Sequence, residues 1–516
     1  MLNKIFTLSF LFLSLSNLLA QDIEKPELLY SNQINTDSLK SYLYYLASDE
    51  LEGRETGKEG QKLAANYLAE KYINYQLKPL LHNKDSYFQE FKLLNKDFKN
   101  SNFIVNNDTL ILKDDYFFFP KFDFLDISSD EILFLGYGID DENYSDLPKD
   151  KSIIKDKIVV VLEGEPKKGK KFLINNSKEK SEWGENENKK LALFTDLGAK
   201  ALFVVAENYE RRSRIIRYIV ERPRLYLEDD SKPSELLPLY YMHPKFLENY
   251  LAIDYDKKLN KKVIKNKLNK EKVFPLKVQL HLDFNTDEVF TENVAAFIPG
   301  KTDEYIIISS HFDHLGKDEE GNIYNGADDN ASGTSSVLEL SRVFMQAYKD
   351  GFKPEKNLIF MNVSGEEKGL LGSDYYTRNP IVPLEKTMTN LNIDMVGRND
   401  KNYSENDEYI YLIGSDKISK KLHDISETAN KEFSNLTLDY TFNDENDPNR
   451  FYYRSDHYNF AKNNIPVIFY FSGVHKDYHK PEDTAEKINY ELLTKRTRLV
   501  FHTAWKLAYT KDLKLD

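Results

Sequence analysis

The chain has 516 residues, of which 41% are hydrophobic and 13% aromatic, as in folded globular proteins rather than disordered ones. Such a length is too great for one ordinary core, so we expect two or more domains. The formal net charge of −13 argues against a nucleic-acid partner, and the absence of cysteine excludes thiol catalysis and cysteine-ligated zinc.

The first 20 residues have the pattern of a secretory signal peptide. Lys4 gives a positive start, residues 5–19 are mostly apolar, and Ala20 is a small residue at the predicted cleavage point. The apolar run is too short for a comfortable membrane span, although an uncleaved anchor shares this pattern. We therefore expect export, with a periplasmic or extracellular location after signal-peptide removal and no stable membrane span in the mature chain.

Residues 21–104 are expected to form the N-terminal part of the main domain. Helical periodicity runs from Thr36 to Tyr75 and is interrupted by a polar turn at 48–54. Residues 105–268 form a predicted β-rich insert, which ends in a basic linker. Its expected features are strands at 109–112, 132–137, 158–162 and 201–205, a solvated lysine-rich loop at 167–190, and the linker at 257–272.

Residues 269–516 alternate apolar strands with amphipathic helices. This alternation predicts an α/β fold whose mostly parallel central sheet is covered by helices on both faces. Ligands of such sheets bind beyond the carboxyl ends of the strands. The predicted strands are 305–309, 357–363, 391–395 and 466–471, and the predicted helices follow Ser332 and span 418–433 and 489–509.

Side chains that bind zinc stand in this region at widely spaced positions. Two imidazoles and three carboxylates can hold two Zn²⁺ ions if one carboxylate is shared. Glu366, next to one of these carboxylates, would then be free to act as a base, and Asp313 could orient the first imidazole. The five candidate ligands are His311, Asp328, Glu367, Asp394 and His479.

Each of these motifs also has a simpler explanation when it is taken alone. Either histidine can be a surface imidazole, the Asp328 turn can be a capped helix start, and Asp394 can form a salt bridge with Arg398. The acidic pair at 366–367 can be solvated. The prediction therefore rests on all five occurring together in this order. Three nearby histidines are not counted as ligands: His314, His457 and His475.

The motifs resemble those of the M28 family of zinc peptidases, which includes bacterial leucyl-type aminopeptidases and glutamate carboxypeptidases. The middle of the chain also resembles a protease-associated insert, through segments near residues 134–139, 155–160 and 197–204. The matching peptidase segments are HFDH from His311, GADDNASG from Gly326, SGEEKGLLGS from Ser364, NIDMVG from Asn392 and DYHKPEDT from Asp477.

This resemblance assigns a role to each candidate residue. It implies one zinc ion on His311 and Asp394, the other on Glu367 and His479, and Asp328 as the bridge. A cis peptide bond is expected at 328–329. The resemblance also implies Glu366 as the general base, Asp313 as the residue that orients His311, and Tyr478 as a donor to the reaction oxyanion.

The expected activity is that of a binuclear zinc aminopeptidase acting on peptide substrates. One alternative is a carboxypeptidase of the same fold, in which Arg450 and Arg454 would grip a C-terminal carboxylate. Others are a glutaminyl cyclotransferase, which uses a single zinc ion, and a non-catalytic binding module. The sequence does not indicate the side-chain preference or the oligomeric state.

Overall fold

The computed structural model describes residues 25–81, 86–118, 124–220, 224–228, 237–253 and 273–516. The predicted signal peptide and the predicted linker at 257–272 lie outside these residues. The chain divides into two compact units. One unit comprises the chain up to Phe91 and from Phe290 onward, and the other runs from Lys92 to Val289.

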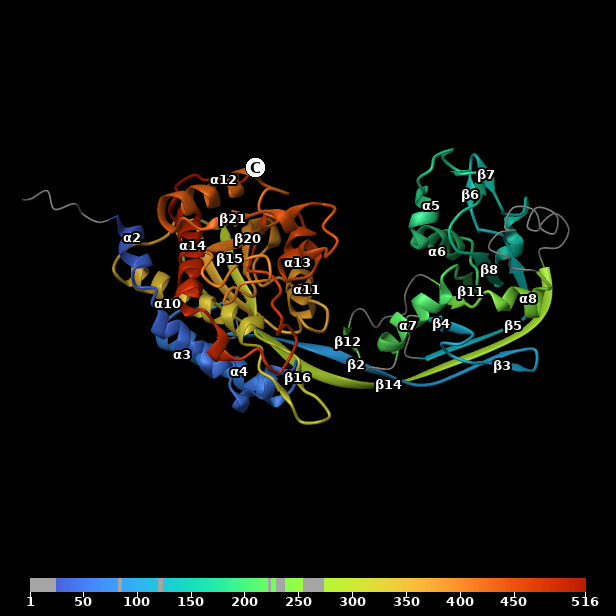
Figure 1. Ribbon diagram of the computed structural model, residues 1–516, viewed down its shortest axis with the longest axis horizontal. Coiled ribbons are helices and arrows are strands. Elements are labelled where there is room, and N and C mark those ends of the chain that lie inside the picture. Colours follow the sequence, from blue (N-terminus) through green and yellow to red (C-terminus); the bar gives the residue numbers. More distant parts are fainter. Residues whose placement is uncertain (1–24, 82–85, 119–123, 221–223, 229–236, 254–272) are drawn as a thin grey trace, which may run out of the picture. The chain divides into compact units, whose positions relative to one another are not determined.

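The first unit is built on a mixed, mostly parallel sheet (Figure 1). Its strand order is β21-β20-β22-β19-β15-β18-β14, with parallel pairing among the central strands β22, β19, β15 and β18. The strands are β14 (Val273–Ile298), β15 (Tyr305–His311), β18 (Asn357–Val363), β19 (Thr387–Ile393), β20 (Tyr409–Ile413), β21 (Thr437–Asp439) and β22 (Val467–Phe471).

Helices cover both faces of this sheet, because its central strands are apolar on both sides. Ile306 and Ile308 point into the core that contains the long helices, whereas Ile307 points into the core on the other face. The first face is covered by α3 (Thr36–Leu46), α4 (Glu59–Tyr75), α10 (Gly333–Lys349) and α14 (Tyr490–Tyr509). The second is covered by α11 (Leu371–Arg378) and α13 (His457–Ala461). The expected α/β architecture is thus confirmed.

Shorter elements complete this unit. The polar turn predicted between the first helices is the short helix η1 (Asp49–Arg54). The others are α2 (Pro26–Ser31), β1 (Lys78–Pro79), β16 (Gly316–Lys317), β17 (Ile323–Tyr324), η4 (Ala327–Ser332), η5 (Leu384–Lys386), α12 (Lys420–Ala429), η6 (Asn430–Ser434), η7 (Thr441–Asn443), η8 (Phe451–Tyr453) and η9 (Ala485–Lys487).

The second unit has its own apolar core. Its strand order is β14-β5-β8-β11-β13-β4, with β2 and β12 off this path. The strands are β2 (Phe88–Val105), β3 (Asp108–Leu110), β4 (Tyr116–Phe118), β5 (Phe124–Phe134), β6 (Asp140–Asp141), β7 (Tyr144–Ser145), β8 (Ile158–Leu162), β9 (Lys167–Lys168), β10 (Lys171–Phe172), β11 (Ala201–Val205), β12 (Arg224–Leu227) and β13 (Leu239–Met242). The helices are η2 (Lys151–Ile154), α5 (Glu182–Glu185), α6 (Glu187–Asp196), α7 (Tyr209–Val220) and α8 (Lys245–Leu251).

Two sequence expectations for this region differ from the structure. The second unit is longer than the predicted insert at 105–268, because β2 and β14 have residues in both units. The predicted solvated loop at 167–190 contains β9, β10, α5 and the start of α6, and Lys190 is buried. Among the described residues, none of the helices has both the length and the apolar composition needed to cross a bilayer.

Candidate metal centre

The candidate side chains of the first unit meet beyond the carboxyl ends of its parallel strands. His311 is the last residue of β15, Glu366 and Glu367 follow β18, and Asp394 directly follows β19. His479 lies in the loop after β22. Because these parallel strands end at the same edge of the sheet, residues far apart in the sequence become neighbours.

One group of potential ligands forms around His311. The Nε2 atom of His311 lies 3.4 Å from Oδ1 of Asp329 and 3.4 Å from Oδ1 of Asp394. The ligand atoms of these three buried residues all lie within 4.8 Å of one another. One imidazole nitrogen and two carboxylate oxygens at this spacing are a ligand set suited to zinc.

A second group of potential ligands forms around Glu367 and shares Asp329 with the first. Nε2 of His479 lies 3.1 Å from Oδ2 of Asp329 and 3.2 Å from Oε2 of Glu367. Nδ1 of His314 lies 2.8 Å from Oε1 of Glu367 and 3.8 Å from Oδ2 of Asp329. The structure therefore offers two imidazoles on this side, and one of them is a histidine that the sequence analysis left out.

The carboxylate between the two groups is Asp329, and not the predicted Asp328. The Oδ1 atom of Asp328 accepts a hydrogen bond from the backbone N–H of Gly397 at 2.6 Å, and its Oδ2 atom lies 3.4 Å from Nε2 of His475. Asp328 thus has a structural position outside both groups. The cis peptide bond is likewise one residue later than expected, between Asp329 and Asn330.

The turn that carries Asp329 is held in place from several sides. Oδ2 of Asp483 accepts hydrogen bonds from the backbone N–H groups of both Asp328 (2.9 Å) and Asp329 (3.2 Å). The Asn330 amide group donates to the carbonyl of Ile393, the last residue of β19, at 3.0 Å. These bonds fix the turn against the strand end from which Asp394 projects.

Gly326, which precedes this turn, has no room for a side chain. It adopts a positive φ of 54°, and an added Cβ would lie 2.1 Å from the carbonyl oxygen of Asp329. Only glycine fits such a backbone position without strain.

Asp313 and Asp394 are each held by further hydrogen bonds. Asp313 accepts from the Thr56 hydroxyl at 2.8 Å and from the backbone N–H of Glu366 at 3.2 Å. Nδ1 of His311 lies 3.2 Å from the Asp313 carbonyl oxygen and 3.8 Å from its carboxylate, so the closer of the two is the backbone group. Ser455 donates to Oδ2 of Asp394 at 2.7 Å.

Arg54 fastens the loops of the centre to one another, a role that its sequence context did not reveal. Its side chain is buried and donates to the carbonyl of Phe312 (2.7 Å), to that of Asn325 (2.8 Å) and to that of Gly326 (3.0 Å). It also donates to the carbonyl of Leu46. Burial lowers the pKa of Arg54 to about 10, against the opposing effect of nearby carboxylates such as Asp313.

The electrostatics of the centre reflect a high density of buried carboxylates. Burial raises the pKa of Glu366 well above its ordinary range, and the neighbouring Glu367 and Asp394 raise it further. Burial also acts to raise the pKa of Asp329, but the imidazoles of His311 and His479 beside it hold this pKa well below its ordinary value. Carboxylates gathered at such density are costly unless cations accompany them.

The donor atoms fit bound dications. Among the residues that the structure describes, several buried atoms of the centre face one another at short distances without the geometry of a hydrogen bond. They are Oε1 of Glu367, Oδ1 of Asp394, Nε2 of His479 and both ring nitrogens of His314. Buried polar atoms are normally satisfied, so atoms left open on facing side chains are the expected state of metal ligands.

A small pocket, with a cavity volume of about 30 Å³, opens onto the centre. Glu366 and Tyr478 lie in its wall together with Asp329 and Asp394. Burial is the main cause that raises the pKa of Tyr478, so its hydroxyl stays protonated and able to donate. The other lining residues are Met395, Phe451, Arg454, Phe469, Phe471 and Val474.

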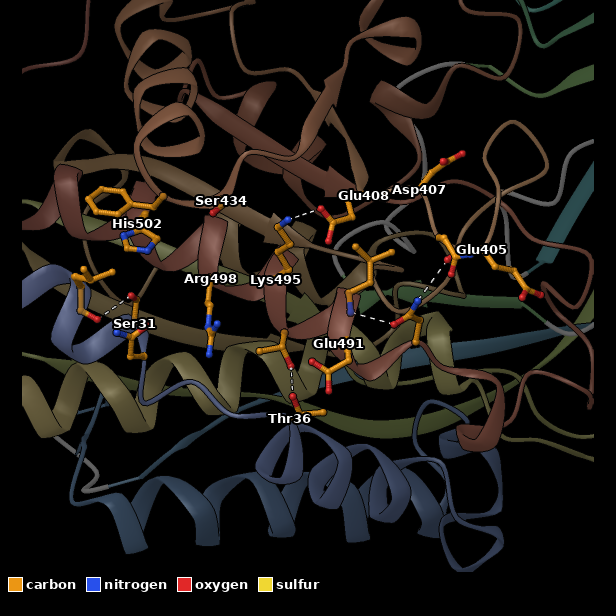
Figure 2. A pocket seen from close by; sticks show the side chains of 17 residues that line it. Ser31, Thr36, Glu405, Asp407, Glu408, Ser434, Glu491, Lys495, Arg498 and His502 are labelled. Atoms are coloured by element: carbon orange, nitrogen blue, oxygen red, sulfur yellow. Dashed lines mark hydrogen bonds and ion pairs between the residues drawn. The ribbon is translucent and has the colours of Figure 1, made fainter.

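Another pocket contains none of the predicted site residues (Figure 2). Lys495 in its wall forms an ion pair with Glu408, and Arg498 donates to the carbonyl of Ile34 at 2.8 Å. None of the carboxylates of the metal centre lines this pocket. The candidate chemistry therefore belongs to the sheet edge and not to this pocket.

Residues 293–504 match the model of peptidase family M28. This segment of the chain is similar to peptidase family M28. The matched segment contains both ligand groups, Glu366 and Tyr478, and lies in the first of the two compact units, which is called the M28 unit below.

Curated proteins are similar to part of the chain, and a solved structure has a similar fold. A probable leucine aminopeptidase of Trichophyton verrucosum (strain HKI 0517) is 30% identical over 224 residues, which are 42% of this chain and 58% of that protein. Aminopeptidase YwaD of Bacillus subtilis (strain 168) is 30% identical over 207 residues, 39% of this chain and 40% of that protein. The chain thus spans less than two thirds of the length of these curated relatives. The structure of an aminopeptidase from Aneurinibacillus sp. strain AM-1 aligns with a TM-score of 0.52 and 17% identity over 95% of this chain and 98% of that one, a likeness of fold.

Proposed function

We propose that this protein is an exported binuclear zinc aminopeptidase that releases N-terminal residues from peptides. The observation that carries the proposal is the pair of histidine–carboxylate groups around one shared Asp329, with Glu366 beside them. The M28 family match and the relatives named as aminopeptidases support the choice of reaction.

In this proposal the two ions occupy the two ligand groups of the centre. His311 and Asp394 hold one ion, Glu367 and His479 hold the other, and Asp329 is shared. His314, 2.8 Å from Glu367, is a further nitrogen donor on the second side. When bound, the zinc ions supply Lewis acidity, which lowers the pKa of a water molecule and polarises the scissile carbonyl.

The protein's own residues handle the protons of the reaction. Glu366 takes a proton from the attacking water and passes it to the leaving amine, a role that suits a buried carboxyl with a raised pKa. Tyr478, protonated and in the same pocket wall, donates a hydrogen bond to the developing oxyanion. Asp313 and Thr56 keep the segment that directly follows His311 in position.

The proposal can be tested with a panel of amino-acid p-nitroanilides, assayed with and without a chelator. We expect free-amine substrates to be cleaved, N-acetylated ones to be left intact, and the chelator to abolish cleavage until zinc is restored. The carboxypeptidase alternative predicts the reverse selectivity, namely cleavage of N-blocked peptides and no cleavage of C-amidated ones. Cleavage that persists after complete metal removal would overturn the zinc mechanism.

Export is part of the same proposal and rests on the leader pattern of the first 20 residues. Export can be measured by fractionating cells that express the full chain with a C-terminal tag. We expect the tagged protein outside the cytoplasm and shortened at its N-terminus. A full-length product confined to the cytoplasm would contradict this part.

A further inference from the structure

Arg454 is a cation in the wall of the pocket that opens onto the metal centre. It follows η8, and its side chain lines the same pocket as Glu366, Asp394 and Tyr478. The remaining walls of that pocket are apolar: Met395, Phe451, Phe469, Phe471 and Val474. The pocket is therefore apolar along its sides and carries one positive charge besides the centre itself.

The guanidinium group of Arg454 is held in place without being neutralised. It stacks on the Phe451 ring, with Cζ 4.9 Å from the ring centroid. Within the described part of the chain, no carboxylate forms an ion pair with this guanidinium group, and Arg454 is solvent-exposed. Stacking on an aromatic face leaves the N–H edges of a guanidinium free to donate.

Arg450 gives an internal comparison four residues earlier. It stacks in the same way, with Cζ 4.8 Å from the Tyr453 ring centroid. It lines a different pocket, however, whose wall contains three acidic residues: Asp444, Glu445 and Asp447. The charge of Arg450 thus lies among carboxylates away from the metal centre.

We infer that Arg454 is a specificity-determining residue that selects substrates with a carboxylate near the scissile bond. This inference rests on the proposed function. A free guanidinium beside apolar walls fits a ligand with an aliphatic stem and an anionic end. The carboxylate comes either from the side chain of an N-terminal glutamyl residue or from the C-terminus of a short peptide. The chemistry recognised is the same in both cases.

Isosteric substrates test this inference. Glutamyl- and glutaminyl-p-nitroanilide differ in charge but hardly in shape, and a dipeptide can be compared with its C-terminal amide. We expect wild type to favour the acid in at least one pair by about tenfold in kcat/KM, the size of one charge-assisted hydrogen bond of about 1.4 kcal/mol. The pair that shows the preference identifies the source of the carboxylate.

Variants of the two arginines separate charge recognition from a structural role. Arg454→Gln should bring the preferred ratio close to one while leucyl-p-nitroanilide is still cleaved, and Arg454→Lys should restore part of the ratio. Arg450→Gln should leave the ratio unchanged. Acid-to-amide ratios that are the same in wild type and Arg454→Gln, or equal losses on all substrates, would overturn the inference.

A binding measurement keeps this test separate from that of the proposed function. Calorimetry with free glutamate and free glutamine, or with a dipeptide and its amide, requires no turnover. Tighter binding of the acid by wild type, lost in Arg454→Gln, supports the inference even if no anilide is cleaved. Cleavage of leucyl-p-nitroanilide without any acid preference in rate or binding refutes the inference and leaves the proposed function standing.

Discussion

Replacing Arg54 with methionine should weaken both the fold and the metal centre of the M28 unit. The side chain donates to four carbonyl groups on three separate segments, namely those of Leu46, Phe312 and the adjacent Asn325 and Gly326. Losing four hydrogen bonds from a charged donor costs roughly 6–12 kcal/mol of stability. The variant no longer buries a charge, and this offsets several kcal/mol of the loss. We therefore expect the free energy of unfolding to fall by about 3–5 kcal/mol.

The two tryptophans allow this effect to be assigned to one unit. Trp505 lies in α14 of the M28 unit and Trp183 in the second unit, so a Trp183→Phe background makes fluorescence report the M28 unit alone. Denaturant titration in this background gives the loss in free energy. Arg378→Met is the matched control, because Arg378 is 40% exposed in an i,i+4 ion pair and should cost less than about 1 kcal/mol.

The reasoning about Arg54 would be refuted if Arg54→Met unfolded within 1 kcal/mol of the Arg378→Met control. A further consequence concerns the metal. Because Arg54 fastens the loops next to His311 and Asp329, its loss should weaken zinc binding by about 10–100-fold, as is typical when a residue that supports metal ligands is removed. An unchanged zinc affinity would mean that the loops keep their positions without it.

Three further predictions concern proton transfer, the ligand turn and the second unit. Glu366→Gln should lower kcat by about 10²–10⁴-fold at unchanged zinc content, and near-normal turnover would remove Glu366 as the base. Asp483→Ala should weaken zinc binding by about 10–100-fold in a competition titration, whereas the exposed neighbour Glu482→Ala should not, because only Asp483 accepts from the backbone of the turn. Burial lowers the pKa of Lys190 to about 8 from 10.5. Between pH 8 and 10.5 the unfolded chain therefore binds one more proton at Lys190 than the folded chain does. The free energy of unfolding of the second unit, measured by Trp183 fluorescence, should rise by up to about 3 kcal/mol over this pH range. Lys190→Met should remove that pH dependence, and an unchanged slope in the variant would show that another group causes it.

The sequence predicted the fold of the M28 unit well, because its central strands are apolar on both faces. β18, at 357–363, was predicted with its exact bounds, and β15 and β22 differ by one or two residues. The second unit was predicted less well. This unit extends beyond the expected boundaries at 105 and 268, because parts of β2 and β14 belong to it. Apolar periodicity does not reveal where one unit ends within a continuous strand.

In the candidate site, sequence spacing located the loops but not every side chain. Asp328 and Asp329 are adjacent carboxylates in one turn, and only the turn's backbone geometry decides which of them faces the histidines. His314 had the right chemistry, yet nothing in its spacing separated it from a surface imidazole. Arg54 and Asp483 act through contacts with residues more than 150 positions away, which no local pattern encodes.

The metal content of two isosteric variants tests the centre most directly. Purified wild type, Asp329→Asn and Asp328→Asn can be loaded with zinc, dialysed and measured by mass spectrometry of the metal. We predict two zinc ions per chain for wild type and for Asp328→Asn, and at most one for Asp329→Asn, because of these two residues Asp329 is the one that belongs to both ligand groups. Two retained ions in Asp329→Asn together with loss in Asp328→Asn would contradict a centre shared through Asp329.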